Sequence, residues 1–211
     1  GGAGGGRAAG SPAAGGAARP AAGGPPRPAS APPGGGTPPP IAGGTAAIGP
    51  LPPPAGPSGG CPFEMLPYDP GPWNDLLYCP TNNCYAYAAN KLALYAHRPQ
   101  PGEASGQPYT VNTGPDVAAA ARRDGAHDAG DCFPDAEAPR LLVALVIWPG
   151  EDYHWYRKHP TCWGHKIGWD PATNLDSSNV IITDPATCDR GLYTVFHGYM
   201  LMPVSQRVAA T

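Results

Sequence analysis

The first 60 residues of this 211-residue chain lack aromatic and acidic side chains altogether. They contain 19 Gly, 15 Pro and 15 Ala, so most of their positions carry little or no side chain that folding can bury. Glycine does not recur at every third position, which excludes a collagen triple helix. We therefore expect a disordered low-complexity tether over residues 1–60, followed by a single folded domain over residues 61–211.

The chain also lacks any run of about 18 apolar residues, so no membrane-spanning helix is predicted, and no basic segment followed by an apolar one marks a signal peptide. The formal net charge is −3, and the only charged residues among the first 60 are arginines, so the predicted domain is acidic. Neither a membrane nor nucleic acid is therefore expected as a partner. Because the chain begins with Gly rather than Met, we expect a fragment or a processed product.

The chain has six cysteines, an even number that fits up to three disulfides in an oxidising compartment. We therefore expect a secreted or extracellular protein. The spacing of the cysteines leaves their pairing open. The six are Cys61, Cys79, Cys84, Cys132, Cys162 and Cys188.

The first half of the predicted domain alternates loops and helices. Residues 61–80 contain five prolines, which favour a lead-in without a helix or an inner strand. A run rich in Ala, Leu and Tyr then predicts a helix at about 83–96, apolar all round and therefore packed on several sides. A loop over residues 99–112 precedes a short Ala-rich helix that opens at Gly114 and ends near Gly125.

The second half is typical of strands. Residues 140–148 form an unbroken aliphatic run that predicts a strand buried on both faces, at the centre of a sheet. Further strands are predicted in residues 152–158, 162–168, 180–183 and 192–202. This order indicates an α+β domain in which the first helix packs on an antiparallel sheet.

Cys84 lies at the first turn of the predicted helix at 83–96, where free backbone N–H groups favour a thiolate and lower the pKa of a thiol. The same N–H groups can supply half of an oxyanion hole. A cysteine at this place is equally typical of a small core residue, or of a disulfide with Cys79 or Cys61. In the strand at 152–158, His154 points away from its neighbour Trp155. A hairpin turning at residues 159–160 places it opposite His165.

The order Asn83-Cys84-Tyr-Ala-Tyr87 at a helix start, then His154 and His165 on strands, resembles the papain-like cysteine amidases of the NlpC and CHAP kind. The resemblance covers residues 78–168. It implies a papain-like fold and a Cys-dependent hydrolase, a thiol protease or amidase, with a peptide or cell-wall-type amide as substrate. Cys84 would be the nucleophile, His154 the general base and His165 the residue that orients it.

Further site residues remain candidates beside these three. Asp170 and Asn174 are alternatives for orienting His154, and Trp163 with Gly164 are candidates for a substrate groove. No Gln lies between residues 61 and 99, so the second oxyanion donor would be Asn82 or Tyr78. No cofactor and no metal are expected.

Two other readings stay open. The first is a zinc site, because imidazole and thiol side chains are zinc ligands and His154, His159, Cys162 and His165 fall within twelve positions. The second is a non-catalytic secreted module, stabilised by disulfides, that binds a partner or has a structural role. The second reading predicts that Cys84 is disulfide-bonded, whereas the enzyme requires it to be free.

Overall fold

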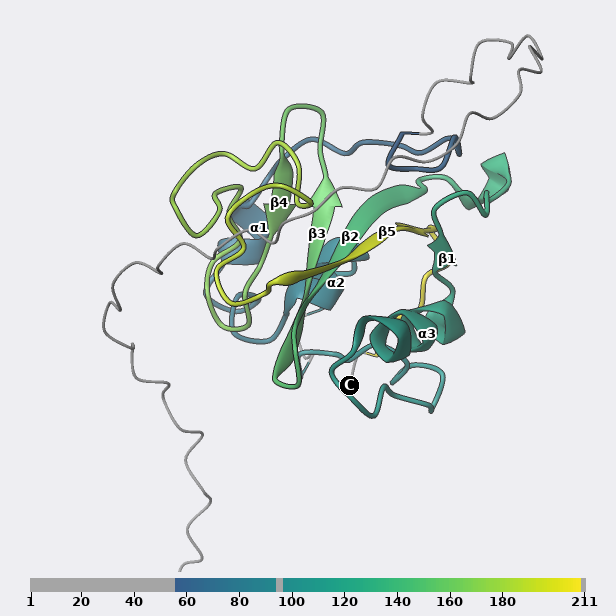
Figure 1. Ribbon diagram of the computed structural model, residues 1–211, viewed down its shortest axis with the longest axis horizontal. Helices are drawn as coiled ribbons and strands as arrows, with labels where there is room; N and C mark the ends of the chain where they lie inside the picture. The colour runs from purple at the N-terminus through teal and green to yellow at the C-terminus, as the bar shows by residue number, and fades with distance from the viewer. Residues whose placement is uncertain (1–55, 94–96, 210–211) are drawn as a thin grey trace, which may run out of the picture. The chain divides into compact units, whose positions relative to one another are not determined.

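The computed structural model describes residues 56–93 and 97–209, which all fall into one compact unit (Figure 1). The predicted tether lies outside the described residues as far as residue 55. Within the described ranges, no helix has the length and apolar character needed to cross a membrane. The elements are α1 (Gly71–Asn74), α2 (Cys84–Ala88), α3 (Gly114–Asp124), β1 (His127–Asp128), the short 3-10 helix η1 (Asp135–Glu137), β2 (Leu141–Trp148), β3 (Asp152–Lys158), β4 (Trp163–His165) and β5 (Val195–Met202).

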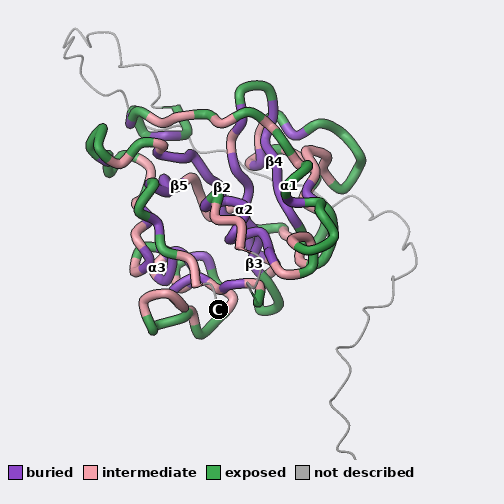
Figure 2. Tube along the Cα trace, turned by 180° about the vertical axis from the view of Figure 1, so that it is seen from behind, coloured by how far each residue is buried: buried purple, intermediate pink, exposed green. Residues whose placement is uncertain are grey.

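The five strands form one antiparallel sheet in the order β1-β5-β2-β3-β4. The predicted central strand is confirmed, because β2 lies between β5 and β3 and its first seven residues are buried. Figure 2 shows the same burial along β2 and much of β3. The protein is thus a mixed helix-and-sheet domain with few helices, and the coarse α+β prediction holds.

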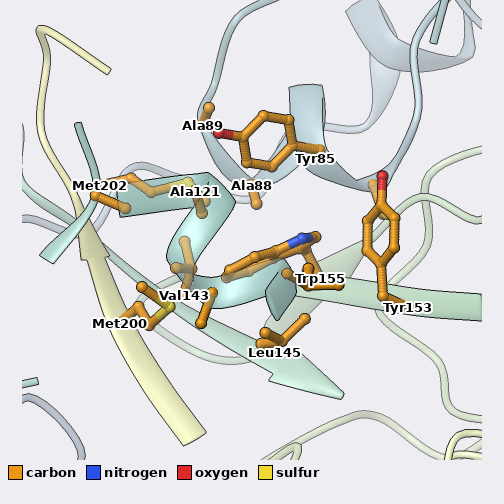
Figure 3. Close-up of a cluster of buried hydrophobic side chains, with 14 of the residues drawn as sticks. Tyr85, Ala88, Ala89, Ala121, Val143, Leu145, Tyr153, Trp155, Met200 and Met202 are labelled. Carbon is orange, nitrogen blue, oxygen red and sulfur yellow. The ribbon is translucent and has the colours of Figure 1, made fainter. Parts of the chain in front are cut away.

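The sheet has a different cover on each of its two faces. The odd-numbered side chains of β2 pack with Trp155 of β3 against α2 and α3 (Figure 3). The even-numbered side chains of β2 pack with Tyr156, Trp163 and Ile182 against loops. Alternation along the strands therefore divides the core into a helix-covered layer and a loop-covered layer.

Helix α2 begins where the sequence predicts but is much shorter. The Asn83 side chain caps it by accepting a hydrogen bond from the Ala86 N–H at 3.1 Å. The helix ends at Ala88, and Asn90 adopts a left-handed conformation with φ of 54°. The Asn82 side chain then bonds both the N–H and the carbonyl of Ala93. These contacts take the chain out of the helix, so the prediction of a helix through residue 96 is wrong.

Two other predictions differ from the structure, and one is confirmed. The lead-in at 61–80 contains the four-residue helix α1, in which Pro72 occupies an early position where its missing N–H costs nothing. The predicted strand at 180–183 is reduced to an isolated bridge between Leu175 and Ile181. Helix α3 is confirmed, with Gly125 as its C-cap at a φ of 122°.

One disulfide joins Cys61 to Cys132, and the other four cysteines are free. The structure has one bridge where up to three were expected. Cys84 is free, so the disulfide that the non-catalytic reading predicted at this residue is wrong. A disulfide is consistent with an oxidising compartment.

Candidate functional site

A cavity of about 300 Å³ lies where β3 begins, beside the N-terminus of α2. Strand β4 pairs only with Tyr156, Arg157 and Lys158, so the first half of β3 has no partner on that side. Cys84 from α2 and His154 from β3 both line the opening that results, together with Asp152. The structure thus brings two of the predicted site residues to one cavity.

The β3–β4 hairpin places His154 next to His165 by a different register from the predicted one. The residue opposite His165 is Tyr156, which is shifted by two positions from His154. A shift of two keeps the same face of the sheet, so the two imidazoles remain diagonal neighbours. His154 Nε2 and His165 Nδ1 are 2.8 Å apart.

The hydrogen bonds of this pair define which ring nitrogens carry protons when both rings are neutral. His165 Nε2 lies 2.9 Å from the Leu175 carbonyl oxygen, which can only accept, so His165 Nε2–H donates. His165 Nδ1 then accepts from His154 Nε2–H. His154 Nδ1 is left as an unprotonated nitrogen, and it has no hydrogen-bond partner among the described residues.

Both imidazoles are held neutral. Burial, and then the neighbouring His165, keep the pKa of His154 well below its usual value. Burial also lowers the pKa of His165, although its bond to the Leu175 carbonyl acts in the opposite direction. The pair is therefore a neutral, hydrogen-bonded unit at ordinary pH.

The Cys84 thiol is also held neutral, contrary to the expectation from its place in the helix. Its burial, followed by the effect of the Asp152 carboxylate, raises the pKa of Cys84 to about 12. Backbone N–H groups, first that of Trp155, favour the thiolate but are outweighed. Within the described part of the chain, no hydrogen bond joins Cys84 Sγ to His154. Proton transfer from this thiol to a weakly basic imidazole is unfavourable, so the arrangement is a neutral thiol beside a neutral base.

The predicted oxyanion residues have other roles. Asn82 is fully buried, and its side-chain amide donates to the carbonyls of Tyr78 and Ala93 at 3.0 and 2.8 Å. Its hydrogen bonds therefore hold the loop that follows α2. Neither Asn82 nor Tyr78 lines the cavity that contains Cys84.

The alternative orienting residues make no hydrogen bond to the side chains of the histidine pair in the described structure. Asp170 is exposed, and its backbone carbonyl accepts a hydrogen bond from Lys166 Nζ. The Asn174 carbonyl accepts from the Ile182 N–H. The partner of His165 is instead a backbone carbonyl, that of Leu175, and side-chain patterns carry no signal for such a contact.

Trp163 and Gly164 lie in the core rather than in a groove at this cavity. Trp163 is 2% exposed and packs in the loop-covered layer. A Cβ on Gly164 would lie 2.3 Å from the Tyr87 hydroxyl and 3.0 Å from His159 Nε2. Glycine at this position therefore serves close packing against α2.

The four residues of the possible zinc site do not converge. His159 uses both ring nitrogens, Nε2 with the Tyr87 hydroxyl at 2.9 Å and Nδ1 with the Leu66 carbonyl at 2.8 Å. No group of three or more His, Cys, Asp or Glu side chains in the described ranges is arranged to hold a metal ion. Alternating strand residues point to opposite faces, which explains this separation.

Sequence reasoning missed several polar side chains at the cavity, among them two tyrosines. Tyr193 donates a hydrogen bond from its hydroxyl to Asp152 Oδ2 at 2.7 Å and closes one wall. Tyr153 donates to Gln100 Oε1 at 2.6 Å and forms another wall. Both partners are distant in sequence, so no local pattern indicates them.

The protonation of Cys84 predicts its reactivity toward iodoacetamide. With a pKa of about 12, roughly one thiol in 10⁵ is ionised at pH 7, and this fraction rises about tenfold with each pH unit. Alkylation of Cys84, followed by mass spectrometry, is expected to be slow at pH 7 and to accelerate continuously to pH 10. The variant His154→Ala is the control and should react at a similar rate. A rate that is already maximal at pH 7, and that falls in this variant, would contradict the assignment.

These features define an α+β domain that carries one disulfide and a cavity with a neutral thiol and a neutral histidine pair. A relative, "Insoluble matrix shell protein 1" of Ruditapes philippinarum, is 44% identical over 135 residues, which cover 63% of this chain and 87% of the relative. The chain belongs to the family of that protein. No protein-family model and no solved structure matches the chain.

This relationship corrects the functional prediction drawn from the resemblance to papain-like amidases. The matched protein is named as a shell matrix protein and not as a peptidase, and no papain-like family model matches. Membership in the papain-like superfamily is therefore wrong, as are the terms hydrolase, thiol protease and amidase. A peptide or cell-wall-type amide as substrate is likewise not supported. The non-catalytic alternative agrees better with the relative.

Proposed function

We propose that the protein is a non-catalytic structural module of an insoluble extracellular matrix. The observation that carries the proposal is the 44% identity to an insoluble matrix shell protein, over most of that protein's length. Secretion to the extracellular space follows from the same proposal. The disulfide between Cys61 and Cys132 supports it, because such bonds persist in oxidising compartments.

The chemistry of the cavity supports a structural role from a separate direction. A catalytic thiol needs a substantial thiolate fraction or a base able to take its proton. Here burial raises the pKa of Cys84 and lowers that of His154, so both changes oppose ionisation. Cys84, His154 and His165 then act as buried polar parts of the domain, linked to the 175–193 loop through the Leu175 carbonyl.

Two measurements test the proposal: the location of the protein in the tissue, and the effect of cysteine substitutions on its retention in the insoluble matrix. An antibody against residues 61–211 should detect the chain in the insoluble extracellular material of its source tissue, the fraction that resists extraction with salt and detergent. Recombinant protein should co-sediment with this insoluble material. The variant Cys84→Ala should co-sediment to the same extent as the wild type.

The variant Cys61→Ser/Cys132→Ser is the matched comparison, because it removes the cross-link and leaves the cavity residues in place. We expect it to be retained less, as its fold is weakened. A protein found only in soluble or intracellular fractions would refute the proposal. So would loss of retention in Cys84→Ala, which would assign the function to the thiol.

A further inference from the structure

Arg157 of β3 is a buried cation without an acidic partner. Arg157 is 2% exposed, and it takes part in no ion pair in the described structure. Residues 1–55, 94–96 and 210–211 contain no Asp or Glu, so all acidic side chains of the chain lie in the described ranges. An arginine is rarely buried to this extent unless a carboxylate neutralises it.

The hydrogen bonds of Arg157 leave one edge of its guanidinium unused. Nη1 donates to the Tyr87 carbonyl at 2.6 Å and to Asn90 Oδ1 at 2.8 Å, both of which are neutral acceptors. Nε is buried and has no hydrogen-bond partner in the described structure. Nη2 makes no hydrogen bond there either, since both bonds of the side chain come from Nη1. Nε–H and Nη2–H lie on the same edge of the planar group, and a ligand can approach this edge at Nη2, because Nε is inaccessible to solvent.

Arg140 shows how the same fold buries an arginine that has partners. It is 5% exposed, and its guanidinium contacts Glu64 Oε1 at 2.6 Å and Asp135 Oδ1 at 2.7 Å. In place of these carboxylates, Arg157 has two neutral oxygen acceptors and the faces of aromatic rings, with its Cζ atom 4.3 Å from the centre of the Tyr87 ring. Arg157 therefore lacks the anionic partners that Arg140 has.

Arg157 also lines a cavity large enough for a small organic molecule. This cavity has a volume of about 420 Å³ and shares no lining residue with the cavity at Cys84. Trp73, Leu66 and Leu92 supply apolar walls. Asp69 also lines it, but this carboxylate is exposed and accepts a hydrogen bond from the Gly71 N–H.

We propose that this cavity binds a small carboxylate ligand, whose anionic group pairs with Arg157 and whose apolar body lies against Trp73 and Leu92. The guanidinium supplies the charge and the unused Nη2–H donors, and the apolar walls bury the rest of the ligand. The site is independent of the structural role proposed above, because it needs neither the disulfide nor Cys84.

The direct test compares phenylacetate, its neutral analogue phenylacetamide and inorganic phosphate, using the whole chain and isothermal titration calorimetry. We expect phenylacetate to bind at least tenfold more tightly than either of the other two. Equal binding of phenylacetate and phenylacetamide would overturn the pairing with Arg157. Equal or tighter binding of phosphate would overturn the choice of a carboxylate, and no binding of phenylacetate would overturn the site.

A variant tests the lack of an anionic partner without removing the arginine. Asn90→Asp places a carboxylate at the position that already accepts from Arg157 Nη1, and aspartate tolerates the left-handed conformation of Asn90. We expect the melting temperature to rise by about 3 °C and phenylacetate binding to be lost. A lower melting temperature in this variant, or unchanged phenylacetate binding, would contradict the proposal.

Two arginine variants form a matched pair. Arg157→Gln should abolish phenylacetate binding, whereas Arg140→Gln should lower the melting temperature and leave the affinity for phenylacetate unchanged. If Arg157→Gln does not fold, the Asn90→Asp result decides the question. Equal loss of affinity in both arginine variants would show a general effect of unfolding and would contradict a specific site.

Discussion

Replacing both disulfide cysteines, in Cys61→Ser/Cys132→Ser, is expected to lower the free energy of unfolding by about 4 kcal/mol. The bond closes a loop with a sequence separation of 71 residues, and a cross-link over such a distance restricts the unfolded chain strongly. Cys61 is also 3% exposed and packs in the loop-covered layer, so its loss affects the folded state as well. Denaturant titration under oxidising conditions measures the change, and it should appear as a large fall in the midpoint.

The control for this experiment is Cys79→Ser, which changes a free cysteine. Cys79 Sγ donates to the Trp169 carbonyl at 3.3 Å, and a serine hydroxyl can donate in the same way. Its midpoint should therefore stay close to that of the wild type. Adding a reductant to the wild type should reproduce the double variant. A wild-type protein that is equally stable with and without reductant would show that the bond contributes nothing.

The second large effect is expected from Trp155→Ala, with a loss of about 3–5 kcal/mol in the free energy of unfolding. Trp155 is fully buried between the helices and the sheet, beside Tyr85, Val143 and Leu145 (Figure 3). Truncation leaves a cavity that the surrounding close-packed side chains fill only in part. The fall in melting temperature, about 10 °C, is measurable by circular dichroism.

Two further variants serve as controls for Trp155→Ala. One tests the contribution of the polar atom of Trp155, and the other tests the effect of removing an exposed tryptophan. Trp155→Phe removes Nε1, which is buried without a hydrogen-bond partner in the described structure, so it should cost clearly less than Trp155→Ala. Trp169→Ala truncates a ring that is 60% exposed and is covered by the Arg98 guanidinium at 3.8 Å. This variant should cost about 1 kcal/mol or less. Equal losses in Trp155→Ala and Trp169→Ala would contradict the assigned core.

The pattern of the sequence predicts the central strand, helix α3 and the face that His154 shares with His165. Each depends on local chemistry: an unbroken aliphatic run, a proline and a glycine at the two ends of a helix, and the period of two along a strand. Period-two alternation also explains why the wrong hairpin register still placed the two imidazoles together, since a shift of two residues keeps the face.

The length of α2 depended on contacts that no local pattern contains. The apolar run through residue 96 favours a helix, but the Asn82 side chain bonds the backbone of Ala93, eleven positions away. A side chain that satisfies the backbone in this way competes with the helical hydrogen bonds. The pairing of Cys61 with Cys132 and the bond from His165 to the Leu175 carbonyl are likewise long-range or involve the backbone.

The sign of the pKa shift at Cys84 was decided by tertiary structure alone. A helix N-terminus favours a thiolate, and the sequence contains that feature. It does not contain the burial of the thiol or its proximity to Asp152, which together outweigh the helix. The lack of an acidic partner at Arg157 also depends on tertiary structure, because it can be recognised only once the positions of all acidic side chains are known. Local order is therefore encoded in short patterns, whereas desolvation and charge pairing depend on how distant segments meet.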